Sequence, residues 1–235
     1  MPVVELSFPV RGTPLPVDNG YIVYRAVARA VPWVAAEAQV GLAIVPIQGN
    51  PHRGFLDLTP GSRLTFRVGA EALPMLEPLA GQCLVFGSAT LILGQPTRSE
   101  LRPAASLVSA FVVVEQCRYS DEVEEWLAAQ FRALGIRAVP ALRRKQVNEH
   151  AGPSDTGRPA SGCPYVRRFR QIGETAVVGW EVLARGLSPE ESLRLQELGV
   201  GPGRRMGCGV FVPERGAVGR SAPRRHSTGV WFPED

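Results

Sequence analysis

The feature that most constrains the fold of this chain is an order of hydrophobic patterns that runs through the sequence twice. Residues 3–10 have the apolar content of a β-strand, and residues 23–31 repeat apolar side chains at the spacing of an amphipathic helix, which Asp18 or Asn19 can cap. The rest of the first half predicts two strands, a helix and two strands, at residues 41–47, 64–68, 70–79, 82–86 and 90–93. This is close to the βαββαβ order of a ferredoxin-like unit.

The second half presents the same order without visible sequence identity to the first. Residues 107–115 are apolar and β-branched like a strand, and Ser120 is expected to cap the helix that follows. A hairpin turns near Gly173, between strand patterns at 165–172 and 176–185. A capped helix and a short strand at 208–213 complete the order. The sequence therefore predicts an α+β fold of tandem ferredoxin-like, or RRM-like, units.

Three segments follow from these patterns. Residues 1–104 form the first unit and residues 105–213 the second, with a Gly-, Pro- and Ser-rich insertion or loop at 140–164. Residues 214–235 form a basic, irregular tail.

Positive charge is concentrated toward the C-terminus. Residues 1–139 carry 11 basic and 12 acidic side chains, and residues 140–235 carry 15 and 10, so the net charges are −1 and +5. A basic half favours a polyanionic partner, because Lys and Arg displace counterions from phosphates. All basic residues except Lys145 are arginine, which suits phosphate recognition. A GC-rich genome would also favour arginine codons, so charge alone does not decide the function.

Composition excludes other classes of protein. The apolar runs fall far short of the roughly 20 residues that span a bilayer, and the N-terminus lacks the basic-then-apolar pattern of a signal peptide. We therefore expect a cytoplasmic protein. The four cysteines are scattered, with no CxxC and no histidine at zinc spacing, so no metal site is expected.

The most distinctive segment follows a capping box at Ser188-Pro189-Glu190-Glu191, which opens a helix to Leu198. Five glycines then occur within eleven residues, at Gly199, Gly201, Gly203, Gly207 and Gly209. Glycine permits positive φ, and successive backbone amides can cradle phosphate oxygens. Arg204 and Arg205 add positive charge there. A purely structural glycine loop remains the alternative, and the spacing does not match a nucleotide-binding P-loop.

Two stretches carry a family resemblance: Gly186-Leu187-Ser188-Pro189-Glu190-Glu191-Ser192-Leu193-Arg194-Leu195-Gln196 and Met206-Gly207-Cys208-Gly209-Val210-Phe211-Val212-Pro213. Phe8-Pro9-Val10-Arg11-Gly12, Leu15-Pro16-Val17-Asp18-Asn19-Gly20-Tyr21 and Leu79-Ala80-Gly81 add to it. Together they resemble the CRISPR repeat-processing endoribonucleases of the RAMP superfamily, in particular the myxan subtype. The resemblance covers about residues 3–213, apart from the 140–164 insertion.

The resemblance implies binding of a CRISPR repeat RNA hairpin and metal-independent cleavage of the precursor transcript. In this family a 2′-hydroxyl attacks the adjacent phosphate, a histidine usually serves as general base, and many members keep the guide RNA as a surveillance-complex subunit. It implies no cofactor. Other subunits of that complex are possible partners.

The chain departs from the family where the general base belongs. The Pro-x-Leu-His context of the subtype is here Pro32-Trp33-Val34-Ala35, and a second family histidine is replaced by Asn19. The histidines present are His52, His150 and His226, and His52 is the best candidate base of the three. Three explanations stay open: a deliberate histidine-to-alanine change at Ala35, a lineage that only binds RNA, or slow cleavage supported by Tyr21, Tyr24, Arg25 or Arg29.

Further basic residues are candidates for RNA contacts. Arg143, Arg144 and Lys145 could follow the RNA backbone or simply be solvated. Strand alternation sends Arg168 and Arg170 to one face, which could meet a hairpin stem. Two other functions compete: a non-catalytic RAMP subunit that only holds guide RNA, and a small-molecule-binding ferredoxin-like regulator.

Overall fold

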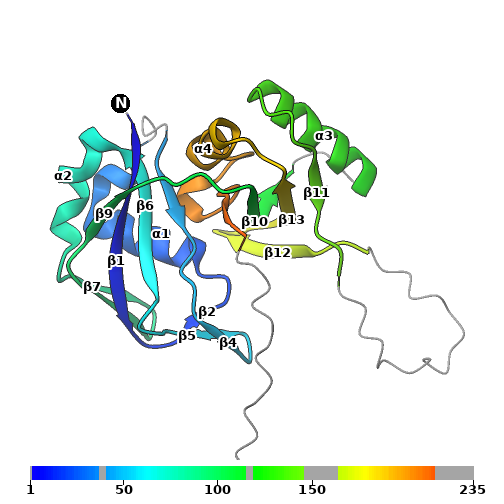
Figure 1. The fold of residues 1–235 in the computed structure, drawn as a ribbon. Coiled ribbons are helices and arrows are strands. Elements are labelled where there is room, and N and C mark those ends of the chain that lie inside the picture. The colour runs from blue at the N-terminus through cyan, green and yellow to red at the C-terminus, as the bar shows by residue number, and fades with distance from the viewer. Residues whose placement is uncertain (1, 37–40, 115–118, 146–163, 215–235) are drawn as a thin grey trace, which may run out of the picture.

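The computed structural model describes residues 2–36, 41–114, 119–145 and 164–214. Figure 1 shows them as two units side by side, the first in blue to teal and the second in green to orange. One hydrophobic core has buried members from Val4 to Leu93, and another has members from Leu107 to Phe211. Each predicted unit therefore contains its own core, while the boundaries at 104 and 213 stay a prediction.

The first unit is built around β1 (Val3–Gly12), which is the central strand of its sheet. One edge of β1 pairs antiparallel with β6 (Arg63–Gly69), and β6 pairs in turn with β3 (Ala43–Val45). Along its other edge β1 pairs with β9 (Thr97–Glu100) and, further on, with β8 (Ala89–Leu93). Even-numbered residues of β1 from Val4 to Val10 are buried while their neighbours are not, which is the period-2 pattern of a half-covered sheet.

Helices and a small hairpin complete this unit. Helix α1 (Gly20–Ala30) buries Val23, Ala26 and Val27, and the 3₁₀ helix η1 (Pro32–Ala35) follows it directly. Strand β8 forms a hairpin with β7 (Cys83–Phe86). A three-stranded sheet joins β2 (Leu15–Pro16), β5 (Phe55–Asp57) and β4 (Asn50–His52). The helix expected over 70–79 is split into η2 (Ala70–Ala72), α2 (Leu73–Leu76) and η3 (Glu77–Leu79), with Pro74 and Pro78 inside it.

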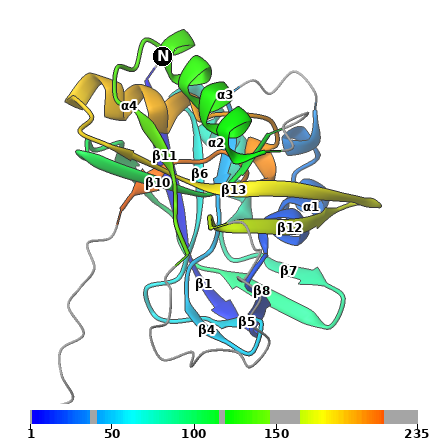
Figure 2. The ribbon, with the colours of Figure 1, turned by 90° about the vertical axis from the view of Figure 1, so that its right-hand side faces the viewer.

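The second unit repeats the topology. Strand β10 (Ser106–Val113) lies between β14 (Val212–Pro213) and β13 (Thr175–Arg185). Strands β11 (Pro140–Leu142) and β12 (Arg167–Ile172) pair with successive parts of β13. Helices α3 (Ser120–Ala133) and α4 (Pro189–Leu198) are the two crossover helices, and both views show them together on one side of this sheet (Figures 1 and 2). The tandem ferredoxin-like prediction is confirmed.

Three local expectations are corrected. Residues 140–142 are strand β11 rather than the start of a loop, because Leu142 is buried and β13 supplies its hydrogen-bonding edge. The N-cap of α3 is Tyr119, not Ser120. The closing strand is shorter than 208–213, since residues 208–211 belong to the glycine-rich segment. Residues 146–163 of the insertion, including His150, and the tail from 215, including His226, lie outside the described residues.

Arg67 on β6 links the two units. Its side chain is 1% exposed and its Nε donates to Glu5 Oε1 at 2.9 Å within the first unit. Its Nη1 donates across to the carbonyl oxygens of Gln196 at 3.1 Å and Phe211 at 2.5 Å. Burial lowers the pKa of Arg67, although Glu5 opposes that shift. The link fixes α4 and the segment after it against the first sheet.

Candidate functional site

The glycine-rich segment, residues 199–211, lies between the two units (orange in Figure 1). It contains the short 3₁₀ helix η4 (Arg204–Met206). All five glycines named from the sequence have positive φ: Gly199, Gly201, Gly203, Gly207 and Gly209. The positive φ that glycine permits is therefore used at each of them.

Packing inside the protein accounts for four of these glycines. A Cβ at Gly209 would lie 1.9 Å from the carbonyl oxygen of Val200, and one at Gly207 would lie 2.8 Å from Pro46 Cγ. A Cβ at Gly199 would lie 2.4 Å, and one at Gly201 2.8 Å, from a backbone carbonyl oxygen. Gly207 contacts Pro46 of the first unit, just after β3, so the segment packs closely against that unit at the junction. This supports the structural alternative for every one of the five glycines except Gly203.

The backbone amides of the segment differ in whether the chain itself already uses them. The amides of Met206, Gly207, Cys208 and Gly209 donate to carbonyl oxygens of the chain itself. Among the described residues, no backbone hydrogen bond uses the amides of Gly203, Arg204 or Arg205. The amides of Gly199 and Val200, at the start of the segment, also donate to carbonyl oxygens of the chain. The amides of residues 203–205, in its middle, can therefore be offered to a phosphate.

The two adjacent arginines have different environments. The guanidinium of Arg204 is turned inward, donates to the carbonyl oxygen of Glu197, and has its pKa lowered to about 10 by burial and by the neighbouring charge of Arg67. Arg205 instead reaches the first unit, where its Nη1 donates to the carbonyl oxygens of Val34 and Ala35 at 3.2 Å and of Ala36 at 3.0 Å. Its Cζ lies 6.0 Å from the ring centroid of Tyr24.

Ala35 is exposed at the end of η1, directly at this contact. The hydrogen bonds found among the described residues use only Nη1 of Arg205, so Nε and Nη2 can donate to a ligand. A guanidinium with free donors can bind a phosphate and stabilise developing negative charge. The methyl group of Ala35 can neither accept nor donate a proton.

Asn19 has a structural role. Its side chain is 1% exposed. Its Nδ2 donates to the carbonyl oxygen of Ile47 at 3.3 Å, and its Oδ1 accepts from the Ile47 amide at 3.2 Å. Asn19 occupies the N-cap position of α1 as expected, but its side chain makes no capping hydrogen bond.

Arg168 and Arg170 do not act together. Arg170 is 10% exposed, pairs with Asp18 of the first unit at 2.8 Å, and stacks over Phe111 with its Cζ 4.1 Å from the ring centroid. Arg168 is 48% exposed and pairs with Glu181 at 3.2 Å. Of the two, only Arg168 is presented for contact with an external partner.

The three basic residues at 143–145 also differ in whether ion pairs hold them. Arg143 is held by Glu181 at 2.5 Å and by Glu214 at 3.0 Å. Arg144 and Lys145 are exposed, with Arg144 Cζ 5.9 Å from the ring centroid of Tyr165. Arg143 therefore fixes the end of β11, and the other two side chains are available to a polyanion.

One surface on β12 was missed by the sequence reasoning. Arg167 lies over Phe169 and Trp180, with its Cζ 5.3 and 5.6 Å from their ring centroids, and Phe169 is 68% exposed. The alternation that pairs Arg168 with Arg170 also places Arg167 and Phe169 together, so the signal was present. An exposed aromatic beside an arginine is a stacking surface for nucleic acid.

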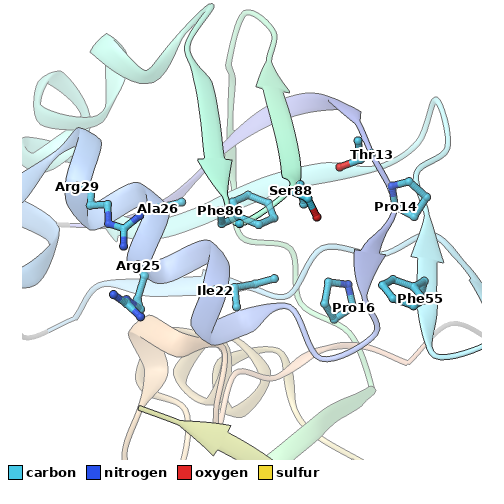
Figure 3. Close-up of a pocket in the computed structure, with 12 residues that line it drawn as sticks. Thr13, Pro14, Pro16, Ile22, Arg25, Ala26, Arg29, Phe55, Phe86 and Ser88 are labelled. Carbon is cyan, nitrogen blue, oxygen red and sulfur yellow. The ribbon is translucent and has the colours of Figure 1, made fainter. Parts of the chain in front are cut away.

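His52 and Arg29 take no part in the contact of Arg205 with residues 34–36. His52 is exposed on β4, which is well separated from the glycine-rich segment in both views (Figures 1 and 2). Arg29 lines a cavity between α1 and the β7–β8 turn (Figure 3). Five positions along an α-helix turn by roughly 140°, so Arg29 and the Arg205-facing Tyr24 occupy different sides of α1.

The described residues also bear on metal binding and membrane insertion. No three His, Cys, Asp or Glu side chains of the described chain are grouped so that they could hold a metal ion. None of its helices is long and apolar enough to cross a membrane.

Comparisons with known proteins agree on one family. A family profile described as "Cas6 Crispr" matches residues 4–216. The CRISPR-associated endonuclease Cas6 of Myxococcus xanthus (strain DK1622) is 32% identical over 213 residues, covering 91% of this chain and 82% of that protein.

Two solved structures show the same fold. A Cas6-related protein from Pyrococcus furiosus is similar with a TM-score of 0.55 at 10% identity, over 89% of this chain and 98% of that one. A RAMP protein described as binding different RNA substrates gives a TM-score of 0.57 at 12% identity, over 88% and 98%. At these identities the likeness concerns the fold alone.

Proposed function

The chain belongs to the Cas6 family of CRISPR-associated proteins, and on that premise we propose that it binds a CRISPR repeat RNA hairpin and processes the precursor transcript. The observation that carries the proposal is the contact of Arg205 with the carbonyl oxygens of residues 34–36. It joins the glycine-rich segment to the position where the family's general base belongs.

The proposed reaction is metal-independent transesterification. A 2′-hydroxyl loses its proton to a general base, its oxygen bonds to the adjacent phosphorus, and the bond from phosphorus to the 5′-oxygen breaks as that oxygen gains a proton. The products are a 2′,3′-cyclic phosphate and a 5′-hydroxyl. Arg205 would stabilise charge on the phosphate through Nε and Nη2, whereas Ala35 supplies no base, so cleavage by this chain should be slow.

Hairpin binding is proposed for the surface formed by Arg144, Lys145, Arg167, Arg168 and Phe169, together with the glycine-rich segment. These cations are exposed or retain exposed donors, and an A-form stem is recognised mainly through shape and phosphate contacts. A protein that makes several phosphate contacts loses on the order of 10³ or more in affinity between about 50 and 200 mM salt. Affinity that is flat over this range would remove the electrostatic basis of the proposal.

Ala35→His tests the catalytic part. Positioned general acid–base groups contribute roughly 10²–10⁴-fold, so single-turnover cleavage of labelled repeat RNA should accelerate by that factor with little change in affinity. The rate of the variant should rise through the imidazole titration near pH ~6.5 and be insensitive to EDTA.

Ala36→His is the matched control, because residue 36 is also exposed and also contacts Arg205. A histidine there should leave cleavage slow, since consecutive side chains at the end of a 3₁₀ helix point in different directions. Equal acceleration by both variants would show that position 35 is not the site of the base.

The absent base favours one alternative, a family member that only holds guide RNA. That function predicts tight hairpin binding with no cleavage by the chain or by Ala35→His. Fast cleavage by the unmodified chain would exclude this alternative and would also move the catalytic group away from position 35.

A further inference from the structure

A large cavity opens on the first unit, on a side of α1 away from Arg205. It measures about 600 Å³ and is lined from α1 by Ile22, Arg25, Ala26 and Arg29, which recur at i, i+3, i+4 and i+7 and so form one stripe of the helix. Phe86 and Ser88 from the β7–β8 hairpin and Phe55 from β5 lie opposite (Figure 3). Pockets that hold small ligands measure roughly 300–1,000 Å³, so one nucleotide would fit.

The charges of this cavity are not neutralised from within. None of its lining residues is acidic, and among the described residues neither Arg25 nor Arg29 forms an ion pair. Arg25 does contact the Tyr21 ring, with its Cζ 5.8 Å from the centroid. Two unpaired guanidinium groups beside apolar walls favour a ligand that combines an anion with a flat apolar face.

A second hollow continues the first. It measures about 450 Å³, shares Pro14 and Phe55 with the first cavity, and adds His52, Arg53 and Asp57. Arg53 has positive φ, at 49°, at the tip of the β4–β5 hairpin. The Phe55 side chain is 53% exposed and borders both hollows, so cations lie on either side of an accessible aromatic ring.

We propose that these two hollows form a track for unpaired nucleotides of the RNA that adjoin the hairpin. A cationic groove interleaved with aromatic rings is how proteins bind single-stranded RNA without strong sequence preference: guanidinium groups contact phosphates, and bases stack on the rings. Phe55 and Phe86 are the stacking residues, and Arg25, Arg29 and Arg53 contact phosphates. The proposal rests on the proposed function, since the track lies on the unit that carries Ala35 and extends the RNA surface beyond the stem.

The test compares three RNAs of the same repeat: a hairpin ending flush at its stem, and the hairpin with a short unpaired extension on either the 5′ or the 3′ side. Affinity is measured by fluorescence anisotropy. Stacking of one base should tighten binding of one extended RNA by about 5- to 150-fold relative to the flush hairpin. A 2-aminopurine in that extension should be quenched on binding.

Phe55→Ala should remove most of the gain and the quenching while leaving affinity for the flush hairpin unchanged. Met75→Ala is the matched control, because its side chain is similarly exposed at 45% but lies outside both hollows. Phe86→Leu provides a second test with less change in volume, and melting temperatures verify that all variants are folded.

Different failures have different meanings. Absence of binding to the flush hairpin would contradict the proposed function. Normal binding of the flush hairpin with no gain from either extension would overturn the track alone. Equal losses for flush and extended RNAs in Phe55→Ala would also overturn it, because the ring would then contact the stem rather than unpaired nucleotides.

Discussion

Two arginines cross the junction between the units in opposite directions, and their surroundings differ. Arg67 reaches from the first unit to the carbonyl oxygens of Gln196 and Phe211. Arg205 reaches from the second unit to those of Val34, Ala35 and Ala36. Arg67 is 1% exposed and has Glu5 as a partner. Arg205 is only partly buried and, among the described residues, has no carboxylate partner.

This difference in burial assigns a stabilising role to Arg67 and a functional role to Arg205. The hydrogen bonds of Arg67 offset the free-energy cost of burying its charge, and a buried charge without partners would destabilise the fold. Arg205 keeps donors available and holds the backbone beside Ala35. The buried arginine therefore fixes how the units dock, and the more accessible one aligns the candidate site that this docking creates.

Arg67→Met should have the largest effect on stability. Removing one partner of a buried ion pair costs about 3–5 kcal/mol, and here two carbonyl oxygens of the second unit also lose their donor. Urea unfolding should show a loss of that size in the free energy of unfolding. Arg63→Met on the same strand is the control, because Arg63 is exposed and bonds only to nearby carbonyl oxygens; a loss as large there would remove the argument from burial.

Gly209→Ala changes the segment that carries Arg205 without altering either arginine. Gly209 and Gly186 have similar φ values of 63° and 71°, but only at Gly209 would a Cβ meet another atom, at 1.9 Å. The left-handed conformation alone costs about 1–2 kcal/mol, which is the loss expected for Gly186→Ala. Overpacking adds about 1–3 kcal/mol in Gly209→Ala. Equal melting temperatures of the two variants would show that the close approach to Val200 is unimportant.

The sequence predicted those parts of the structure that local interactions determine. Ser188 and Glu191 form the expected capping box, with Glu191 N to Ser188 Oγ at 3.2 Å and Ser188 N to Glu191 Oε2 at 2.9 Å. The hairpin between β12 and β13 turns at Gly173 with positive φ. Both depend on residues only a few positions apart, so their patterns are visible in one sequence.

Contacts between distant segments were beyond the same reasoning. Arg204 and Arg205 are adjacent and chemically identical, but η4 packs against α1 and β3. In that position the Arg204 side chain turns inward, and the Arg205 side chain reaches the carbonyl oxygen of Ala35. Asn19 was expected as a helix cap and as the replacement of a family histidine, but its hydrogen-bond partner Ile47 is 28 positions away. The family resemblance identified Ala35 as the candidate position of the general base. That Ala35 lies beside Arg205 is known only from the structure.

Arg205→Met should affect the reaction more than the fold. Loss of its hydrogen bonds should cost only about 1 kcal/mol of stability. In an Ala35→His background, misplacement of residue 35 should lower the single-turnover rate at saturating RNA by roughly 10- to 100-fold. The affinity for RNA should change by a smaller factor than this rate. Arg205→Lys should recover part of the lost rate. A rate that is unchanged while stability falls would make Arg205 another docking residue like Arg67.

The smallest effect is expected for the third link between the units, the ion pair of Asp18 with Arg170 at 2.8 Å. Burial raises the pKa of Asp18 even though Arg170 and Arg168 oppose the shift, so desolvation outweighs their attraction. A carboxyl whose pKa is higher in the folded protein than in the unfolded chain disfavours folding once it ionises. The contribution of Asp18 to the free energy of unfolding therefore falls as pH rises from the ordinary aspartate pKa through the higher pKa of the folded protein.

Asp18→Asn should remove this pH dependence and change stability at neutral pH by no more than about 1 kcal/mol, the range of partly exposed ion pairs. The amide oxygen can still accept from Arg170 Nε, which limits the loss, while the desolvation cost of the carboxylate disappears. Urea unfolding of both proteins from acidic to neutral pH measures the two slopes. Asp57→Asn, at an exposed carboxylate on β5, is the matched control for the substitution. A loss at neutral pH close to that of Arg67→Met would instead place Asp18 among the buried docking contacts, and the contrast between buried and accessible links would fail at this position.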